Sequence, residues 1–369
     1  MIDQMPAALS WKIGSEIFDR VYDSYLDFLG TTLGRFLGYL QRDDQASYER
    51  LSTAIEQTAD PGFLRVLTAP EMTRRLLAPQ HYPSSEVADF FATGLRVEAA
   101  RGGEKPPFES PCWSATGDMV CNPDGTIVQF PQVESLMPLD FGSPYATHID
   151  LGGAKDRNAD ANPPFNRFET EFLTNGLQEV RDSLRKTNPT ILEFCSRFNV
   201  VLVLQKDAAD TVVSSGSTRQ YIGRSCLGNP QIASIADIAN GIVHEGIHGL
   251  LYMQEVQQEW VSDPELRDST RRVISPWTGT NLALRPFLQA CFVWYGLAQF
   301  WSQALANSSI ADKCSARSWL EQSVVGFTKE PLLWYIRQFE EFVSEDVKNA
   351  ISLMQDAIMR VMRATAQVA

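Results

Sequence analysis

The stretch IADIANGIVHEGIHGLLYM, residues 235–253, decides the fold of this chain. Ile235, Ile242 and Leu250 recur at multiples of about 3.6 residues, so they share one face of a helix. Such an apolar stripe is typical of a helix that packs against a hydrophobic core. We therefore expect a long helix over about residues 234–258.

This helix carries the motif His244-Glu245-Gly-Ile-His248. Two histidines at positions i and i+4 lie on one helical face about one turn apart, so their imidazoles can bind a single metal ion. Glu245 stands beside that face, where a carboxylate can take the proton of a metal-bound water. Only four histidines occur in 369 residues, and two of them have this spacing. The sequence predicts a metal site with His244 and His248 as ligands and Glu245 as a catalytic residue.

The third metal ligand is the open question. One metallopeptidase group extends the motif to HExxHxxGxxH, but this chain has Leu251 and Gln254 at the two added positions. A thermolysin-like site takes a glutamate from a following helix instead, so a zinc-dependent peptidase is an alternative interpretation. The acids that follow lie in a polar stretch that we expect to face solvent: Glu255, Glu259, Glu265 and Asp268.

A second apolar segment, PFLQACFVWYGLA at residues 286–298, predicts a buried helix. Gln289 is the only strongly polar side chain in its first half. A buried amide without a partner costs about 1–3 kcal/mol, so Gln289 needs a side chain, a backbone group or a metal as partner. Arg285 precedes the segment, and its guanidinium can bind a carboxylate in bidentate fashion or form an ion pair with an acid of the chain.

Three consecutive regions surround these helices. Residues 1–100 have helical periodicity and predict an N-terminal helical region. Residues 101–165 are rich in Gly and Pro and predict loops with short strands. Residues 166–369 form the expected metal-site domain. We expect helices over about 15–41, 46–58, 70–77, 84–100, 167–188, 282–306 and 344–366 and strands over about 126–130, 199–205, 211–215 and 220–226.

The resulting fold class is α+β and predominantly α-helical, with a small β-sheet that precedes a zincin-like HExxH active-site helix. NVVLVLQ at 199–205 is the clearest strand, because it is β-branched and bounded by polar residues. Gly216-Ser-Thr-Arg219 is the expected turn between the last two strands. Composition agrees with a globular chain of this kind, since 44% of residues are hydrophobic and 21% are charged.

The net charge and the lack of targeting signals in the sequence limit the classes of partner that we expect. The chain has 32 Lys and Arg and 45 Asp and Glu, a net charge of −13. An acidic surface repels phosphate, which argues against nucleic acid and against an anionic membrane surface. The first residues lack a secretory signal, no apolar run is long enough to span a bilayer, and the six cysteines are scattered. We expect a soluble cytoplasmic protein; the sequence allows a homo-oligomer.

Four segments together resemble one protein family: SSGSTRQYIG (214–223), VHEGIHGLL (243–251), ISPWTG (274–279) and LRPFLQACFVW (284–294). The chain resembles the HExxH-motif peptide-modification proteins over about residues 195–305. Described members of that family are iron- and 2-oxoglutarate-dependent peptide β-hydroxylases, often encoded with ribosomal peptide natural products. The resemblance implies an oxidoreductase, a dioxygenase that hydroxylates a C–H bond of a peptide or amino-acid-derived natural-product precursor.

The resemblance also implies cofactors and site residues. Fe(II), with Zn(II) as the alternative, would be held by His244, His248 and a third group, and 2-oxoglutarate would be the cosubstrate. The family has a third metal-binding histidine where this chain has Gln289, so Gln289 is the expected ligand, with His148 as a substitute. Arg285 would hold the far carboxylate of 2-oxoglutarate. Expected pocket walls are Trp277, Phe292 and Trp294. Because one family ligand is replaced, a degenerate, non-catalytic binding partner in a biosynthetic complex is a further alternative.

Overall fold

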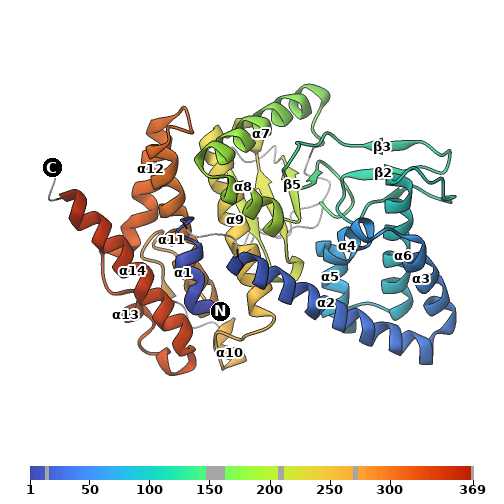
Figure 1. The fold of residues 1–369 in the computed structure, drawn as a ribbon, viewed down its shortest axis with the longest axis horizontal. Helices are drawn as coiled ribbons and strands as arrows, with labels where there is room; N and C mark the ends of the chain where they lie inside the picture. The colour runs from blue at the N-terminus through green and yellow to red at the C-terminus, as the bar shows by residue number, and fades with distance from the viewer. Residues whose placement is uncertain (13–15, 147–162, 207–211, 269–272, 367–369) are drawn as a thin grey trace. The chain divides into compact units, whose positions relative to one another are not determined.

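The structure, a computed structural model, describes residues 1–12, 16–146, 163–206, 212–268 and 273–366 (Figure 1). The chain forms two units, each assembled from separate segments. Unit 1 comprises residues 1–22, 180–194 and 235–369, and unit 2 comprises residues 23–179 and 195–234. The three regions expected from composition follow the chain in order, whereas these units interleave along it, because packing brings distant segments together.

Unit 1 is almost entirely helical. The chain passes from one unit to the other within α2 (Glu16–Asp43), α7 (Arg167–Thr187) and α8 (Pro189–Phe198). The other helices of unit 1 are η1 (Ile2–Gln4), α1 (Met5–Ala8), α9 (Ile235–Glu255), α10 (Pro264–Arg267), α11 (Leu284–Ala306), α12 (Lys313–Val325), η6 (Gly326–Thr328), α13 (Leu332–Ile336), η7 (Glu340–Phe342) and α14 (Glu345–Ala366). Two short strands, β8 (Val273–Ile274) and β9 (Asn281–Leu282), pair antiparallel.

Helices α9 and α11 form the buried centre of unit 1. Most residues of both helices are buried, and the apolar segment 286–298 lies in α11 as the sequence predicts. They approach closely at Gly296, where an added Cβ would stand 2.6 Å from Ile247 Cδ1. The indole of Trp301 on α11 donates a 2.9 Å hydrogen bond to Asn240 Oδ1 on α9. The close approach and this hydrogen bond fix the histidine-bearing helix against its neighbour.

Unit 2 combines helices with two small sheets. Its helices are α3 (Gln45–Gln57), α4 (Asp60–Thr68), α5 (Pro70–Leu77), η2 (Pro79–His81), α6 (Ser84–Arg101), η4 (Arg219–Tyr221) and η5 (Pro230–Ile232). Its strands are β1 (Cys112–Trp113), β2 (Met119–Cys121), β3 (Ile127–Gln129), β4 (Leu139–Asp140), β5 (Val201–Gln205), β6 (Ser214–Ser217) and β7 (Arg224–Gly228). Strands β1, β2 and β3 form an antiparallel sheet in that order.

The larger sheet of unit 2 has the order β4-β5-β7-β6. Strands β4, β5 and β7 are parallel, with Val203 opposite Cys226, and β6 pairs antiparallel with β7. Strand β5 is buried along its first four residues, which explains its uninterrupted apolar sequence. Gly216 and Ser217 belong to β6 and pair with β7, so the expected turn at 216–219 begins later than predicted.

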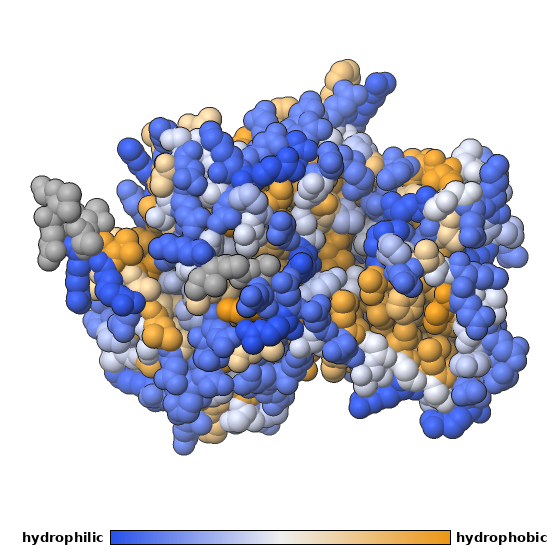
Figure 2. Space-filling view, in the orientation of Figure 1, coloured by the Kyte–Doolittle hydropathy of each residue, from blue (hydrophilic) through white to orange (hydrophobic). Residues whose placement is uncertain are grey.

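The structure confirms the coarse fold class: the described chain is mainly helical with small sheets, an α+β arrangement. Within the described part of the chain, every helix is too short or too polar to span a lipid bilayer. Figure 2 shows a face covered largely by hydrophilic residues, with hydrophobic residues gathered over the helices of unit 2.

Candidate metal centre

The motif residues come together on α9 in unit 1. One possible ligand atom from each of His244, Glu245 and His248 lies within 4.8 Å of the others. The two imidazole rings are 5.1 Å apart between centroids, as expected for positions one helical turn apart. Glu245 is buried, and its Oε1 lies 3.9 Å from His244 Nε2. Both histidines are only partly buried, so the group is accessible from one side.

Gln289 on α11 contacts this group through His248. Its Oε1 lies 2.9 Å from His248 Nδ1, and its Nε2 donates a 2.7 Å hydrogen bond to Glu255 Oε1. Because the Nε2 of Gln289 is used by Glu255, its oxygen is the atom that faces the imidazole. This arrangement places the proton of His248 on Nδ1 and leaves Nε2 with a lone pair for a metal.

Of the partners that the sequence allowed for Gln289, the structure shows side chains. Its amide oxygen lies against Nδ1 of His248, and its predicted role as a metal ligand stays a prediction. An oxygen bound to His248 Nδ1 is on the opposite side of the imidazole ring from Nε2. The amide nevertheless faces the histidine pair, and Gln289 is buried, as the apolar sequence around it predicts.

Glu255 is the residue of this site that sequence reasoning missed. The polar sequence after α9 suggested that it faces solvent, but its side chain is only 3% exposed. It follows His248 by seven residues, which is two helical turns and the same helical face. That spacing was the available signal. Glu259, Glu265 and Asp268 are exposed, as expected.

Arg285, the expected cosubstrate residue, already faces two carboxylates. Its Nη2 lies 2.5 Å from Asp268 Oδ1, and its Nη1 lies 3.8 Å from Glu255 Oε2. Nη1 is buried and forms no hydrogen bond in the described structure. Binding of 2-oxoglutarate by Arg285 stays a prediction, and it would require the incoming carboxylate to replace Asp268.

Aromatic side chains border His244. Trp294 meets the His244 ring edge-on at 6.1 Å, and Trp277 stacks on Trp294 at 6.1 Å with an interplanar angle of 13°. Both tryptophans are buried. Burial lowers the pKa of His244 to about 4, an effect that His248 adds to and Glu245 opposes. A neutral imidazole is the form that binds a metal ion.

The other expected wall residue lies elsewhere. Phe292 is fully buried and packs on Trp260 at 5.2 Å, so it belongs to the core of unit 1. Trp277 is held by a 3.0 Å hydrogen bond from its Nε1 to Ser323 O. Gly326 leaves the space for its indole, since a Cβ there would stand 2.3 Å from the ring. Of the three expected wall residues, Trp294 contacts a histidine, and Trp277 packs against Trp294.

No second group suited to a metal occurs among the described His, Cys, Asp and Glu residues. Three of the four acids considered for a thermolysin-like site have other partners: Glu259 and Asp268 pair with Arg267, and Glu255 binds Gln289. His148, the substitute ligand of the sequence analysis, lies outside the described residues.

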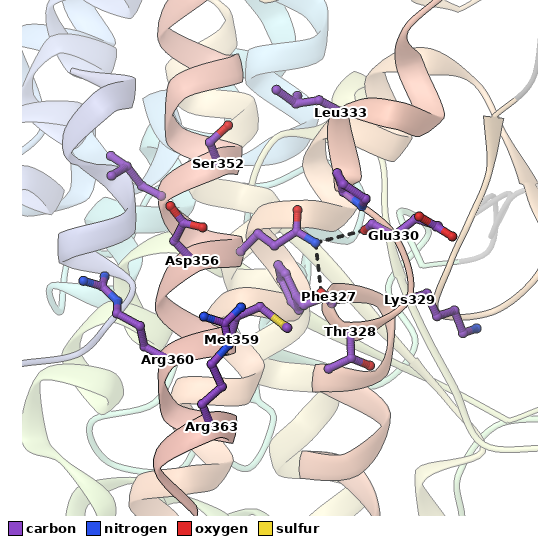
Figure 3. A pocket seen from close by; sticks show the side chains of 13 residues that line it. Phe327, Thr328, Lys329, Glu330, Leu333, Ser352, Asp356, Met359, Arg360 and Arg363 are labelled. Carbon is purple, nitrogen blue, oxygen red and sulfur yellow. Dashed lines mark hydrogen bonds between the residues drawn. The ribbon is translucent and has the colours of Figure 1, made fainter. Parts of the chain in front are cut away.

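A pocket of about 590 Å³ lies in unit 1 between α14 and the η6–α13 segment (Figure 3). Gln355 spans it, since its Nε2 donates 2.9 Å hydrogen bonds to Phe327 O and Glu330 O. Arg360 and Arg363 lie along α14, and Lys329 is on the opposite wall. None of the predicted site residues lines this pocket, so it is separate from the histidine group.

Comparison with known proteins does not place the chain in a family. No family model matches its sequence, and a search of curated proteins finds no match.

Proposed function

We propose that this protein is a metal-dependent oxygenase whose Fe(II) is held by His244 and His248 and which hydroxylates a C–H bond of a peptide or amino-acid-derived substrate. The observation that carries the proposal is the convergence of two imidazoles and one carboxylate within 4.8 Å. Two histidines and a carboxylate are the donor set of many non-haem Fe(II) oxygenases, whose remaining positions stay open.

The residues around the donors fit a bound metal. Gln289 orients His248 with Nε2 free, and Glu255 in turn holds the amide of Gln289. Partners of this kind fix the tautomer and the ring angle of a metal-binding histidine. Glu245 lies beside His244 Nε2, within reach of the metal or of a water bound to it. Trp294, backed by Trp277, excludes water from one side of His244.

Fe(II), together with 2-oxoglutarate and O₂, supplies the oxidising chemistry that such a hydroxylation needs. In this proposal His244 and His248 bind the metal, and Gln289 keeps His248 in place. Arg285 binds the far carboxylate of 2-oxoglutarate after exchange with Asp268. The resemblance to the HExxH-motif peptide-modification proteins supports this choice of cosubstrate and of substrate class.

A zinc-dependent peptidase is the second candidate. The position of Glu245 favours it, because a buried carboxylate 3.9 Å from His244 Nε2 is suited to take a proton from a water molecule. The third protein ligand of a thermolysin-like site would then be a glutamate on a following helix. The described acids after α9 lack that placement, so the oxygenase is preferred.

Metal content and turnover test the proposal. The protein is purified without oxygen, and its iron and zinc are measured for wild type, His244→Ala, His248→Ala and the control His81→Ala. His81 is exposed and lies in unit 2, outside the donor group. We expect bound metal in wild type and His81→Ala and its loss in the other two variants. Unchanged metal in His244→Ala and His248→Ala would contradict the site.

Reaction class is tested with the loaded protein. An oxygenase consumes 2-oxoglutarate and forms succinate only when Fe(II) and O₂ are present, whereas a peptidase cleaves unstructured peptides with Zn(II) under argon. Oxygen-independent peptide cleavage that is lost in Glu245→Gln would replace the oxygenase by the peptidase. Metal binding without either activity would support the degenerate binding partner.

A further inference from the structure

Three arginines gather in unit 2, and none of them belongs to the metal centre. Arg74 and Arg75 lie on α5, and Arg224 lies on β7. One carboxylate, that of Glu71, serves two of them: Arg224 Nη2 donates to its Oε1, and Arg75 Nη1 donates to its Oε2 at 2.5 Å. We call Arg74, Arg75 and Arg224 the arginine cluster.

Aromatic rings hold these guanidinium groups in place. The Arg224 and Arg74 guanidinium carbons lie 3.9 and 4.6 Å from the centroid of the Tyr221 ring. The Arg75 guanidinium lies 4.1 Å from the Phe90 ring. Stacking on aromatic faces fixes the planes of the guanidinium groups while it leaves their edge N–H donors available.

The cluster has more donors than described acceptors. Besides the bonds to the Glu71 carboxylate, Arg75 Nη1 donates to Glu71 O, and Arg74 donates through Nε to Tyr82 and through Nη1 to Gln220. Arg74 Nη2, Arg75 Nη2 and Arg224 Nη1 form no hydrogen bond to a described residue. Arg74 and Arg75 are partly exposed, so the cluster is open to solvent on their side.

Two further nitrogens are enclosed without a partner. These are Arg75 Nε and Arg224 Nε, and the whole Arg224 side chain is only 4% exposed. Keeping a buried charge without full compensation is costly. The described acids supply only part of that compensation. Burial raises the pKa of Asp140 above its ordinary value, while hydrogen bonds from Ser143 and Gly142 and the charge of Arg224 oppose that rise.

We propose that the arginine cluster is a binding site for a dianionic phosphate group, as in a phosphate monoester. Arg75 and Arg224 share one carboxylate, and Arg74 pairs with none, which leaves an excess of positive charge in a chain of net charge −13. A phosphate offers three oxygens to three guanidinium groups, whereas a carboxylate offers two. The site is independent of the proposed metal chemistry.

Isothermal titration of the full-length protein with inorganic phosphate and with glycerol phosphate, at ionic strength held constant with chloride, tests the proposal. We expect saturable binding of both, with Arg74→Gln weakening it at least about tenfold, the scale of one charge-assisted hydrogen bond. Succinate at the same concentrations should bind more weakly. Absence of saturable phosphate binding, or tighter binding of succinate, would overturn the proposal.

Two variants separate the site from general charge effects. Arg337→Gln removes an arginine that also stacks on an aromatic ring, at 4.4 Å from Trp334, but lies in unit 1. It should bind phosphate like wild type. Equal weakening in Arg337→Gln and Arg74→Gln, or unchanged binding in Arg74→Gln, would contradict the assignment. Arg224→Gln should abolish phosphate binding. Because Arg224 is buried, the folding of this variant is checked by circular dichroism. If the variant does not fold, the result for Arg74→Gln decides.

Discussion

Gln289 Oε1 lies 2.9 Å from His248 Nδ1, so a buried amide on α11 sets the orientation of a metal-competent histidine on α9. The same amide donates to Glu255, whose carboxylate approaches Arg285. The histidine is therefore the end of a chain of polar contacts between two packed helices. Such chains restrict the ring of a ligand more than a single contact does.

Loss of the amide should weaken metal binding. Gln289→Leu leaves His248 Nδ1 without its acceptor, and we expect metal affinity to fall by about 10–100-fold. A competition titration against a metal-binding dye measures the change. Gln254→Leu is the matched control: Gln254 lies on α9 and is also buried, but its amide oxygen accepts a hydrogen bond from Trp260. It should cost stability and leave metal affinity unchanged; equal metal affinity in wild type and Gln289→Leu would exclude the positioning role.

Asp268 should compete with the cosubstrate for Arg285. Asp268→Asn removes the carboxylate at 2.5 Å from Arg285 Nη2, so the KM for 2-oxoglutarate should fall. Arg285→Gln should raise this KM at least about tenfold, since a charge-assisted pair is lost. Succinate formation at varied 2-oxoglutarate measures both. If Arg285 only supports Glu255, neither KM changes, and the unfolding free energy of Arg285→Gln falls instead.

Gly326 should be essential to the position of Trp277. In Gly326→Ala the new Cβ meets the indole at 2.3 Å, which forces Trp277 or the η6 backbone to move. We expect a loss of about 1–3 kcal/mol in the free energy of unfolding and an altered tryptophan emission spectrum. Urea unfolding followed by fluorescence provides both numbers.

Gly34→Ala serves as the control for that substitution. Gly34 lies in the interior of α2 and is exposed. A Cβ added there would meet no atom within 4 Å outside the backbone of its own helix. Alanine there should stabilise by about 0.5–1 kcal/mol, because glycine is less favourable in a helix. A similar loss of stability in both variants would show that the indole contact is not the cause.

Asp118 should make the protein sensitive to acid. It accepts hydrogen bonds from Arg101 at 2.8 Å and from Ser114 at 2.7 Å. Burial raises the pKa of Asp118, but the charge of Arg101 and these hydrogen bonds together lower it by more. The net result is a pKa below the ordinary 3.8. A lowered pKa in the folded state gives stabilisation that is present above the ordinary pKa and is lost as pH falls through the folded pKa.

Asp118→Asn should therefore cost about 3 kcal/mol at pH 7, where a buried ion pair is broken, and should flatten the loss of stability below pH about 4. Unfolding free energies across this range test the sign. Asp124→Asn is the control, because the pKa of Asp124 is also lowered although its side chain is fully exposed. A steeper acid loss in Asp118→Asn than in wild type would reverse the assignment.

The amino-acid sequence determined most of the long helices and the histidine pair, whereas α4 and α8 were not predicted. Helix α9, helix α11 and the last helix α14 lie within a few residues of the predicted bounds, because a 3.6-residue apolar period is a local property of the chain. The spacing of His244 and His248 put both on one helical face for the same reason. Strand β5 was recognisable as an uninterrupted apolar run.

Tertiary structure decided which polar groups meet. Gln289 and Glu255 are 34 residues apart, and Arg224 and Glu71 are 153 apart. The parallel pairing of β4 with β5 also joins distant segments. No local period encodes such contacts, because they depend on how two elements pack and on which side chain then loses its water. Burial made Glu255 a partner of Gln289, although its polar neighbours in the sequence indicated solvent.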